Sequence, residues 1–128
     1  MLRRLLLAAI ALAVPALAEI ASFEDVEFHD KNIENGKVKN RDGMFHLDRD
    51  TGVIVFTSEN RVLVTIPSRR ITSVTYDDKK DRSLVILYND ARERQREASF
   101  KLKSGNRENI LNVINSETDN KLVRISKK

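Results

Sequence analysis

The stretch GVIVFTSENRVLVTIP, residues 52–67, decides the fold of this chain. Val53 to Thr57 are β-branched or aromatic, a composition that suits a pleated sheet. Ser58-Glu59-Asn60 forms a turn, and apolar residues then alternate with the others from Arg61 to Ile66. Pro67 ends the second strand because it cannot donate a ladder hydrogen bond. The stretch therefore predicts a pair of antiparallel strands.

Similar strand patterns lie on both sides of this pair. They cover four further segments: Met44–Leu47, Ile71–Tyr76, Leu84–Tyr88 and Arg96–Leu102. Leu84–Tyr88 is the most apolar of the four and is predicted to lie inside its sheet. Parallel crossovers need a dozen or more residues, and the turns here are shorter, so we expect an antiparallel meander.

The apolar period changes after Leu102. Ser104 can cap a helix over residues 106–117, in which four apolar residues share one face: Ile110, Leu111, Val113 and Ile114. Residues 122–125 then form a short strand or an extended tail. The fold class is therefore mainly β with one C-terminal α-helix, in which an antiparallel barrel or two orthogonal sheets are capped by that helix.

The N-terminus has the features of a secretory signal peptide. Arg3 and Arg4 precede an apolar run from Leu5 to Val14, and the Ala16-Leu17-Ala18 pattern suits signal peptidase. The run is much shorter than the roughly 20 apolar residues that span a bilayer. We expect cleavage near Ala18 and a mature chain in the periplasm or outside the cell.

The rest of the chain is expected to form one domain. Residues 19–42 are a polar lead-in with an edge strand around Val26 and Phe28, and residues 43–126 carry the fold. The chain has no cysteine, which excludes disulfides and thiol catalysis. The formal net charge of +4 falls by two with the leader, and its charges are interleaved, so no nucleic-acid partner is expected.

Several strand segments together resemble the pleckstrin-homology (PH) superfamily, and within it the GRAM-like and related bacterial PH-like domains. The resemblance is carried by six segments and a terminal helix: GMFHLD (43–48), GVIVF (52–56), VTIP (64–67), RITSVTY (70–76), LVILY (84–88) and FKL (100–102). It implies a binding scaffold and not an enzyme. Phosphoinositide binding through the first strand loop is not carried over, because residues 48–52 contain Asp48 and Asp50, which repel phosphate.

Catalytic and metal motifs are weak in this sequence. His29 adjoins Asp30, and His46 shares a predicted strand face with Asp48, but two histidines make a thin ligand set. Asp48-x-Asp50-x-Gly52, with Glu59 further on, is only partly similar to a calcium loop, so a turn is favoured. No nucleophile elbow or phosphate-binding glycine loop occurs, and we expect neither an enzyme nor a cofactor.

One cationic cluster is a candidate anion-binding site. It comprises Arg92, Arg94, Arg96, Lys101, Lys103 and Arg107. Acidic residues interrupt this cluster, a pattern that is also typical of local ion pairs on a solvent-exposed face. The favoured hypothesis is an exported interaction module that binds an envelope protein or peptide at an exposed strand edge or a strand–helix groove. The alternative is a binder of anionic membrane lipid or glycan through this cluster, and an uncharacterised hydrolase is the third.

Overall fold

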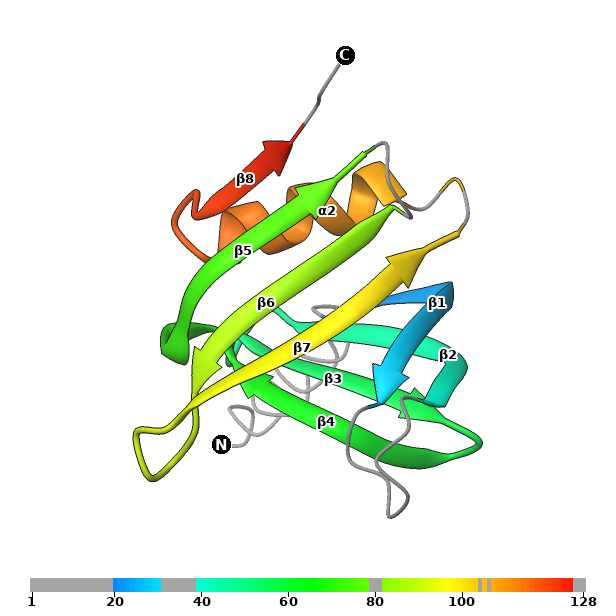
Figure 1. Cartoon of the computed structure of the whole chain (residues 1–128), viewed down its shortest axis with the longest axis horizontal. Helices are drawn as coiled ribbons and strands as arrows, with labels where there is room; N and C mark the ends of the chain where they lie inside the picture. The colour runs from blue at the N-terminus through cyan, green and yellow to red at the C-terminus, as the bar shows by residue number, and fades with distance from the viewer. Residues whose placement is uncertain (1–19, 31–38, 79–81, 104, 106, 126–128) are drawn as a thin grey trace, which may run out of the picture.

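The chain folds into one continuous β-sheet and one α-helix (Figure 1). The computed structural model describes residues 20–30, 39–78, 82–103, 105 and 107–125. The strands are β1 (Ile20–Asp30), β2 (Lys39–Asp48), β3 (Val53–Ser58), β4 (Arg61–Pro67), β5 (Ile71–Asp77), β6 (Ser83–Asn89), β7 (Gln95–Leu102) and β8 (Leu122–Ile125). A 3-10 turn, η1 (Ser68–Arg70), joins β4 to β5, and helix α2 (Arg107–Glu117) precedes β8. The predicted leader lies outside the described residues, as does Ser104, the predicted helix cap.

The strand order is β4-β3-β2-β1-β7-β6-β5-β8. Figure 1 shows β2, β3 and β4 running across the direction of β5, β6 and β7, so the sheet bends into two layers. The bend is located in β1, where the register shifts between Phe23 and Val26 and Asp25 has a φ of 57°. A bulge of this kind bends a strand and increases its twist. The predicted fold class, mainly β with a C-terminal helix, is confirmed.

The position predicted for the N-terminal strand was wrong. β1 is eleven residues long and pairs with β2 on one side and with β7, through Val26 to Phe28, on the other. It therefore lies inside the sheet and is not an edge strand. Its polar residues suggested an edge, but alternation still brings Val26 and Phe28 into the core.

The helical face expected from the sequence is the buried face of α2. Ile110, Leu111 and Ile114 are all at most 1% exposed. The helix ends at Glu117, because Asp119 and Asn120 adopt the left-handed backbone region with φ of 55° and 63°. The N–H and the hydroxyl of Thr118 both donate to the carbonyl of Ile114, which completes the hydrogen bonding of the last turn. β8 then pairs with β5 in parallel, which is the one departure from the antiparallel arrangement among the described strands.

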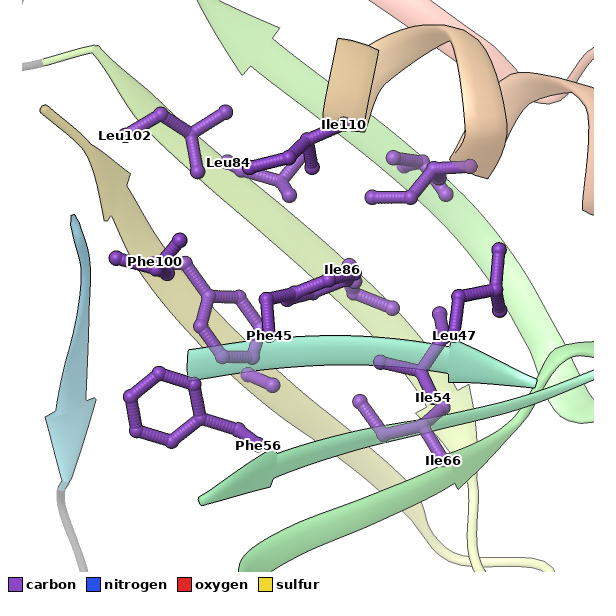
Figure 2. Packing of buried hydrophobic residues seen from close by; sticks show 14 of the residues in the cluster. Phe45, Leu47, Ile54, Phe56, Ile66, Leu84, Ile86, Phe100, Leu102 and Ile110 are labelled. Atoms are coloured by element: carbon purple, nitrogen blue, oxygen red, sulfur yellow. The ribbon is translucent and has the colours of Figure 1, made fainter. Parts of the chain in front are cut away.

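Four phenylalanines join the two layers of the sheet. The Phe100 ring on β7 lies 5.2 Å from the Phe28 ring, 5.5 Å from that of Phe45 and 5.6 Å from that of Phe56, centroid to centroid. Figure 2 shows aliphatic side chains continuing this cluster, with Ile110 approaching from the helix. All four rings are buried, so the interior is shared by both layers.

Candidate binding surface at the open edge of the sheet

Two strands end the sheet, and they differ in what surrounds them. β8 has four residues and β4 has seven. The outer edge of β4 has no strand partner among the described residues. Free strand edges present unpaired N–H and C=O groups to any segment that can pair with them. β4 is therefore a template for an added strand.

A bulge in β4 changes the side-chain pattern expected from the sequence. The register against β3 shifts between the Phe56–Val64 and Thr57–Val62 pairs, so that Leu63 is the extra residue. The predicted alternation would place Val62, Val64 and Ile66 on one buried face. Ile66 is buried, but the shift leaves Val62 60% exposed.

A cleft of about 360 Å³, which we call the hairpin cleft, lies at the C-terminal end of β4. It separates β4 from the turn that joins β6 to β7. Its lining comes from four elements and includes Thr65, Pro67, Arg70, Tyr88, Ala91 and Arg96. The cleft therefore combines apolar surface with two guanidinium groups, directly beside the open strand edge.

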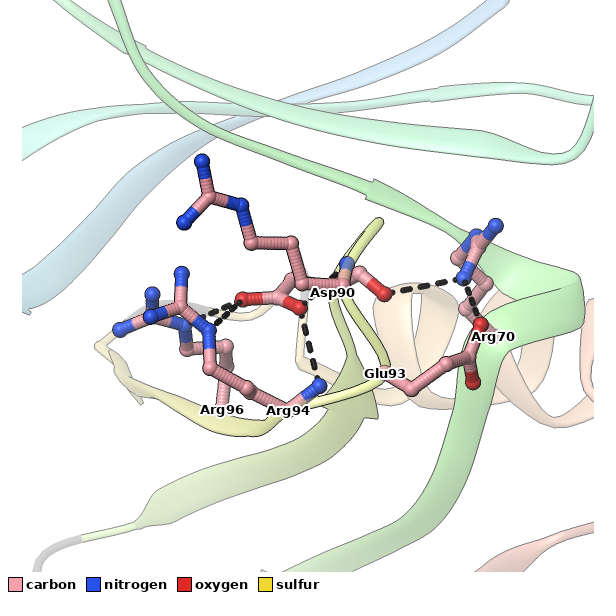
Figure 3. A network of polar contacts seen from close by, with 6 residues as sticks. Arg70, Asp90, Glu93, Arg94 and Arg96 are labelled. Atoms are coloured by element: carbon pink, nitrogen blue, oxygen red, sulfur yellow. Dashed lines mark hydrogen bonds and ion pairs between the residues drawn. The ribbon is translucent and has the colours of Figure 1, made fainter.

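Asp90 organises the turn next to this cleft (Figure 3). Its Oδ1 accepts the backbone N–H groups of Arg92 at 2.8 Å and Arg94 at 3.0 Å. Its Oδ2 accepts the Nε–H groups of Arg94 at 3.2 Å and Arg96 at 2.9 Å. These bonds, the backbone N–H of Arg94 foremost, hold the pKa of Asp90 well below its usual range.

Arg70 connects this turn to the end of β4. Its Nη1 donates to the backbone oxygen of Asp90 at 3.0 Å and to Oε2 of Glu93 at 3.2 Å. Tyr88 lies at the end of β6, where burial raises the pKa of its phenol. At neutral pH the cleft therefore presents a neutral phenol, two arginines and the ionised carboxylate of Asp90, which is already bonded to the turn.

The six cations predicted as an anion site form two groups and not one patch. Arg92, Arg94 and Arg96 lie at the β6–β7 turn, whereas Lys101, Lys103 and Arg107 lie at the other end of β7. The eight residues of β7 separate the groups by on the order of 25 Å. A single small anion cannot contact both groups.

A second hollow, of about 300 Å³, lies beside Lys103. Glu24, Asp25 and Asp42 also line it. Nζ of Lys103 lies 2.7 Å from Oδ1 of Asp42, whose side chain is 72% exposed. Water reaches this carboxylate, so the hollow is a solvent-exposed depression held by an ion pair.

The two histidines are held by neighbouring side chains. Nδ1 of His46 lies 2.8 Å from the Ser22 hydroxyl and its Nε2 lies 3.0 Å from the Thr57 hydroxyl. His29 lies 3.7 Å from Glu27. No group of three or more potential ligands that could hold a metal ion occurs among the described residues.

The partial calcium-loop pattern is a turn, as predicted. The N–H of Gly52 donates to the carbonyl of Asp48, and Oδ1 of Asp48 accepts the N–H groups of Asp50 and Thr51. Gly52 has a φ of 71°, which a residue with a side chain rarely adopts. Asp48 thus caps the turn with its own carboxylate.

The hairpin cleft was not predicted from the sequence. The usable signal was Asn89-Asp90 followed by three arginines at alternate positions, because an Asp at the start of a turn accepts N–H groups just after it. The periodicity of the sequence could not show that Pro67 and Arg70 lie opposite that turn.

In the described part of the chain, no helix is both long and apolar enough to cross a bilayer.

Comparison with known proteins leaves the fold as the shared feature. No protein-family model matches the sequence, and no curated protein matches it significantly. A solved heterodimer of Spt16D and Pob3N matches with a TM-score of 0.59 and 9% identity, over 85% of this chain and 56% of that one. The C-terminal phosphotyrosine interaction domain of mouse APBB2 matches with a TM-score of 0.56 and 13% identity, over 78% of this chain and 86% of that one. Both neighbours are PH-like, and the chain has the PH-like fold that the sequence predicted.

Proposed function

We propose that this chain is an exported, non-enzymatic interaction module that binds an extended segment of a protein or peptide in the cell envelope. The segment adds to β4 as a further antiparallel strand. The observation that carries this proposal is the unpartnered edge of β4, which leads directly into the hairpin cleft. Backbone hydrogen bonds to such an edge supply affinity, and a pocket beside it supplies selectivity.

The structural neighbours support an interaction module in kind. One is a phosphotyrosine interaction domain by name, and the other forms part of a heterodimer. We also propose that the chain is GRAM-like and of bacterial origin, as its sequence resemblance implies.

Export of the chain is proposed from the leader pattern, and mass spectrometry of the chain recovered from a bacterial periplasm tests it. Export requires a mature N-terminus at Glu19, and a chain that keeps Met1 in the cytoplasm would contradict it.

Binding of anionic lipid or glycan through the Arg92–Arg107 region is the alternative. The separation of its cations into two groups favours the peptide proposal, because each group is partly neutralised by its own carboxylates. Cosedimentation with vesicles rich in anionic lipid tests the alternative. Salt-sensitive binding that needs both Arg92 and Lys101 would favour it over strand addition.

Two exposed valines offer a matched test of the edge. Val62 on β4 is 60% exposed and Val123 on β8 is 59% exposed, so they differ mainly in location. A photo-crosslinking residue is placed at each position in turn, and cells are irradiated before the envelope is isolated. We expect the Val62 position to give one defined adduct, mapped to an extended segment of its partner, and the Val123 position to give none. Equal crosslinking at both positions would contradict docking at β4.

A further inference from the structure

We propose that the segment docked on β4 is acidic, and that its carboxylates and one apolar side chain occupy the hairpin cleft. This inference rests on the proposed addition of a strand to β4 and names the chemistry of the occupant. Two arginines line the cleft, Arg70 and Arg96, and two more, Arg92 and Arg94, lie in its turn. Two carboxylates oppose these four cations: Asp90, which also lines the cleft, and Glu93, which pairs with Arg70. The surplus of positive charge attracts an acidic partner.

The ion pairs inside the turn leave donors available. Arg96 uses only its Nε toward Asp90, and its side chain is 47% exposed. The guanidinium of Arg92 has no ion-pair partner among the described residues. A guanidinium presents its N–H groups as a fixed fork that fits a carboxylate with two parallel bonds. Arg96 can therefore hold Asp90 and an incoming carboxylate at once.

The floor of the cleft favours an apolar side chain beside the acidic ones. Tyr88, Pro67 and Ala91 line the same space of about 360 Å³ and carry most of its apolar side chains. One aliphatic side chain fills part of that space, and the Tyr88 hydroxyl is a donor that a neighbouring carboxylate can accept from. The preferred sequence is therefore an aliphatic residue beside Asp or Glu.

The direction of β4 fixes where the acidic residues occur in the partner. β4 runs from Arg61 toward Pro67, so its last residues lie at the cleft. A segment that adds in the antiparallel sense, the more stable pairing per residue, places its N-terminal residues there. The acidic residues therefore precede the extended part of the ligand.

Charge also argues against a second copy of this chain as the occupant. Antiparallel pairing of two β4 strands would bring Arg61 of each copy toward the arginines around the cleft of the other. Like charges placed opposite each other in a sheet are destabilising. An acidic peptide meets the same groups with favourable charge.

Two blocked peptides of identical composition test this inference with the full chain. Acetyl-EDLTVTVTVT-amide carries its acids at the N-terminal end, and acetyl-TVTVTVTLED-amide carries them at the C-terminal end. Affinity is measured by fluorescence anisotropy at low salt, and amide hydrogen exchange reports on β4. We expect the first peptide to bind about tenfold more tightly than the second and to slow exchange in β4.

Arg96 and Arg94 provide a matched pair of variants, because both donate to Oδ2 of Asp90 and only Arg96 lines the cleft. Arg96→Gln should weaken the first peptide about fivefold or more, while Arg94→Gln should change its affinity less than about twofold. Equal losses in the two variants would overturn the role assigned to the cleft.

The failures of the two proposals are distinguishable. Equal affinity for both peptides, with exchange slowed in β4, would overturn the acidic occupant and leave strand addition standing. Binding of the first peptide without slower exchange in β4 would overturn both. Absence of peptide binding, with or without binding to anionic vesicles, would also overturn the acidic occupant.

Discussion

Truncation of Phe100 tests whether the two layers of the sheet share one interior. The ring is fully buried on β7 and contacts three other rings. Phe28 is its neighbour on the paired strand β1, whereas Phe45 and Phe56 come from β2 and β3 of the opposite layer. Phe100→Ala removes these contacts and leaves a cavity, at a cost of about 3–5 kcal/mol in the free energy of unfolding. Small domains have only about 5–15 kcal/mol in total, so this variant should be near the limit of folding.

Phe100→Leu gives a measurable intermediate case. Leucine keeps the site apolar but loses all three ring contacts, so we expect a cost on the order of 2 kcal/mol. Urea unfolding followed by circular dichroism measures it, and this signal suits a chain without tryptophan. Val62→Ala on the exposed edge is the control, with an expected change within about 0.5 kcal/mol. A cost below about 1 kcal/mol for Phe100→Ala would refute the shared interior.

Three further predictions concern single positions. Gly43→Ala should destabilise the chain strongly, because its Cβ would overlap the carbonyl oxygen of Thr57, and Gly105→Ala, with nothing within 4 Å, is the control in thermal unfolding. Asp90→Asn should lower the melting temperature at pH 7. Because the folded pKa of Asp90 is depressed, its contribution is fully present above the unfolded pKa of about 3.9 and is lost progressively as pH falls from there toward the folded pKa. The difference in melting temperature between wild type and variant should therefore narrow steadily as the pH is lowered below about 4. Arg124→Gln should speed amide hydrogen exchange in β8, because Arg124 pairs with Asp78 and Glu108. These pairs are partly exposed, so the variant should lose less than about 1 kcal/mol in the free energy of unfolding. Unchanged exchange would show that the pairs do not hold β8 in place.

Local patterns sufficed for most of the strands and for the helix. Val53 to Thr57 and Ile110 to Ile114 each carry a complete period of buried and exposed residues, and that period is set by neighbours along the chain. The place of β1 could not be obtained in this way. The pairing of β1 with β7 places Phe28 beside Phe100. The bulge at Asp25, which accompanies this pairing, cannot be recognised from the hydropathy of the sequence. A sheet position of this kind depends on contacts far apart in sequence.

The candidate site likewise has a part that local sequence predicts and a part that it does not. The charge of the arginines after Asp90 could be predicted from their spacing, but their partners could not. Arg70 reaches Asp90 across 20 positions of sequence, and the cleft exists only because the end of β4 lies opposite that turn. Chemistry carried by one segment is readable locally, whereas a cleft between segments depends on the tertiary fold.

The two edge strands of the sheet, β8 and β4, differ in how their surroundings cover them, and that difference favours a docking role for β4. β8 covers the edge of β5, and Arg124 ties it to Asp78 and Glu108 at 2.9 Å each. β4 has no such cover among the described strands, yet it is not a bare template: a bulge interrupts its ladder and Pro67 removes its last N–H donor. Bulges, proline and charge are the devices by which sheets resist indiscriminate pairing. An edge that is shielded by these devices and flanked by an apolar, cationic cleft is suited to one complementary strand and resists adventitious ones.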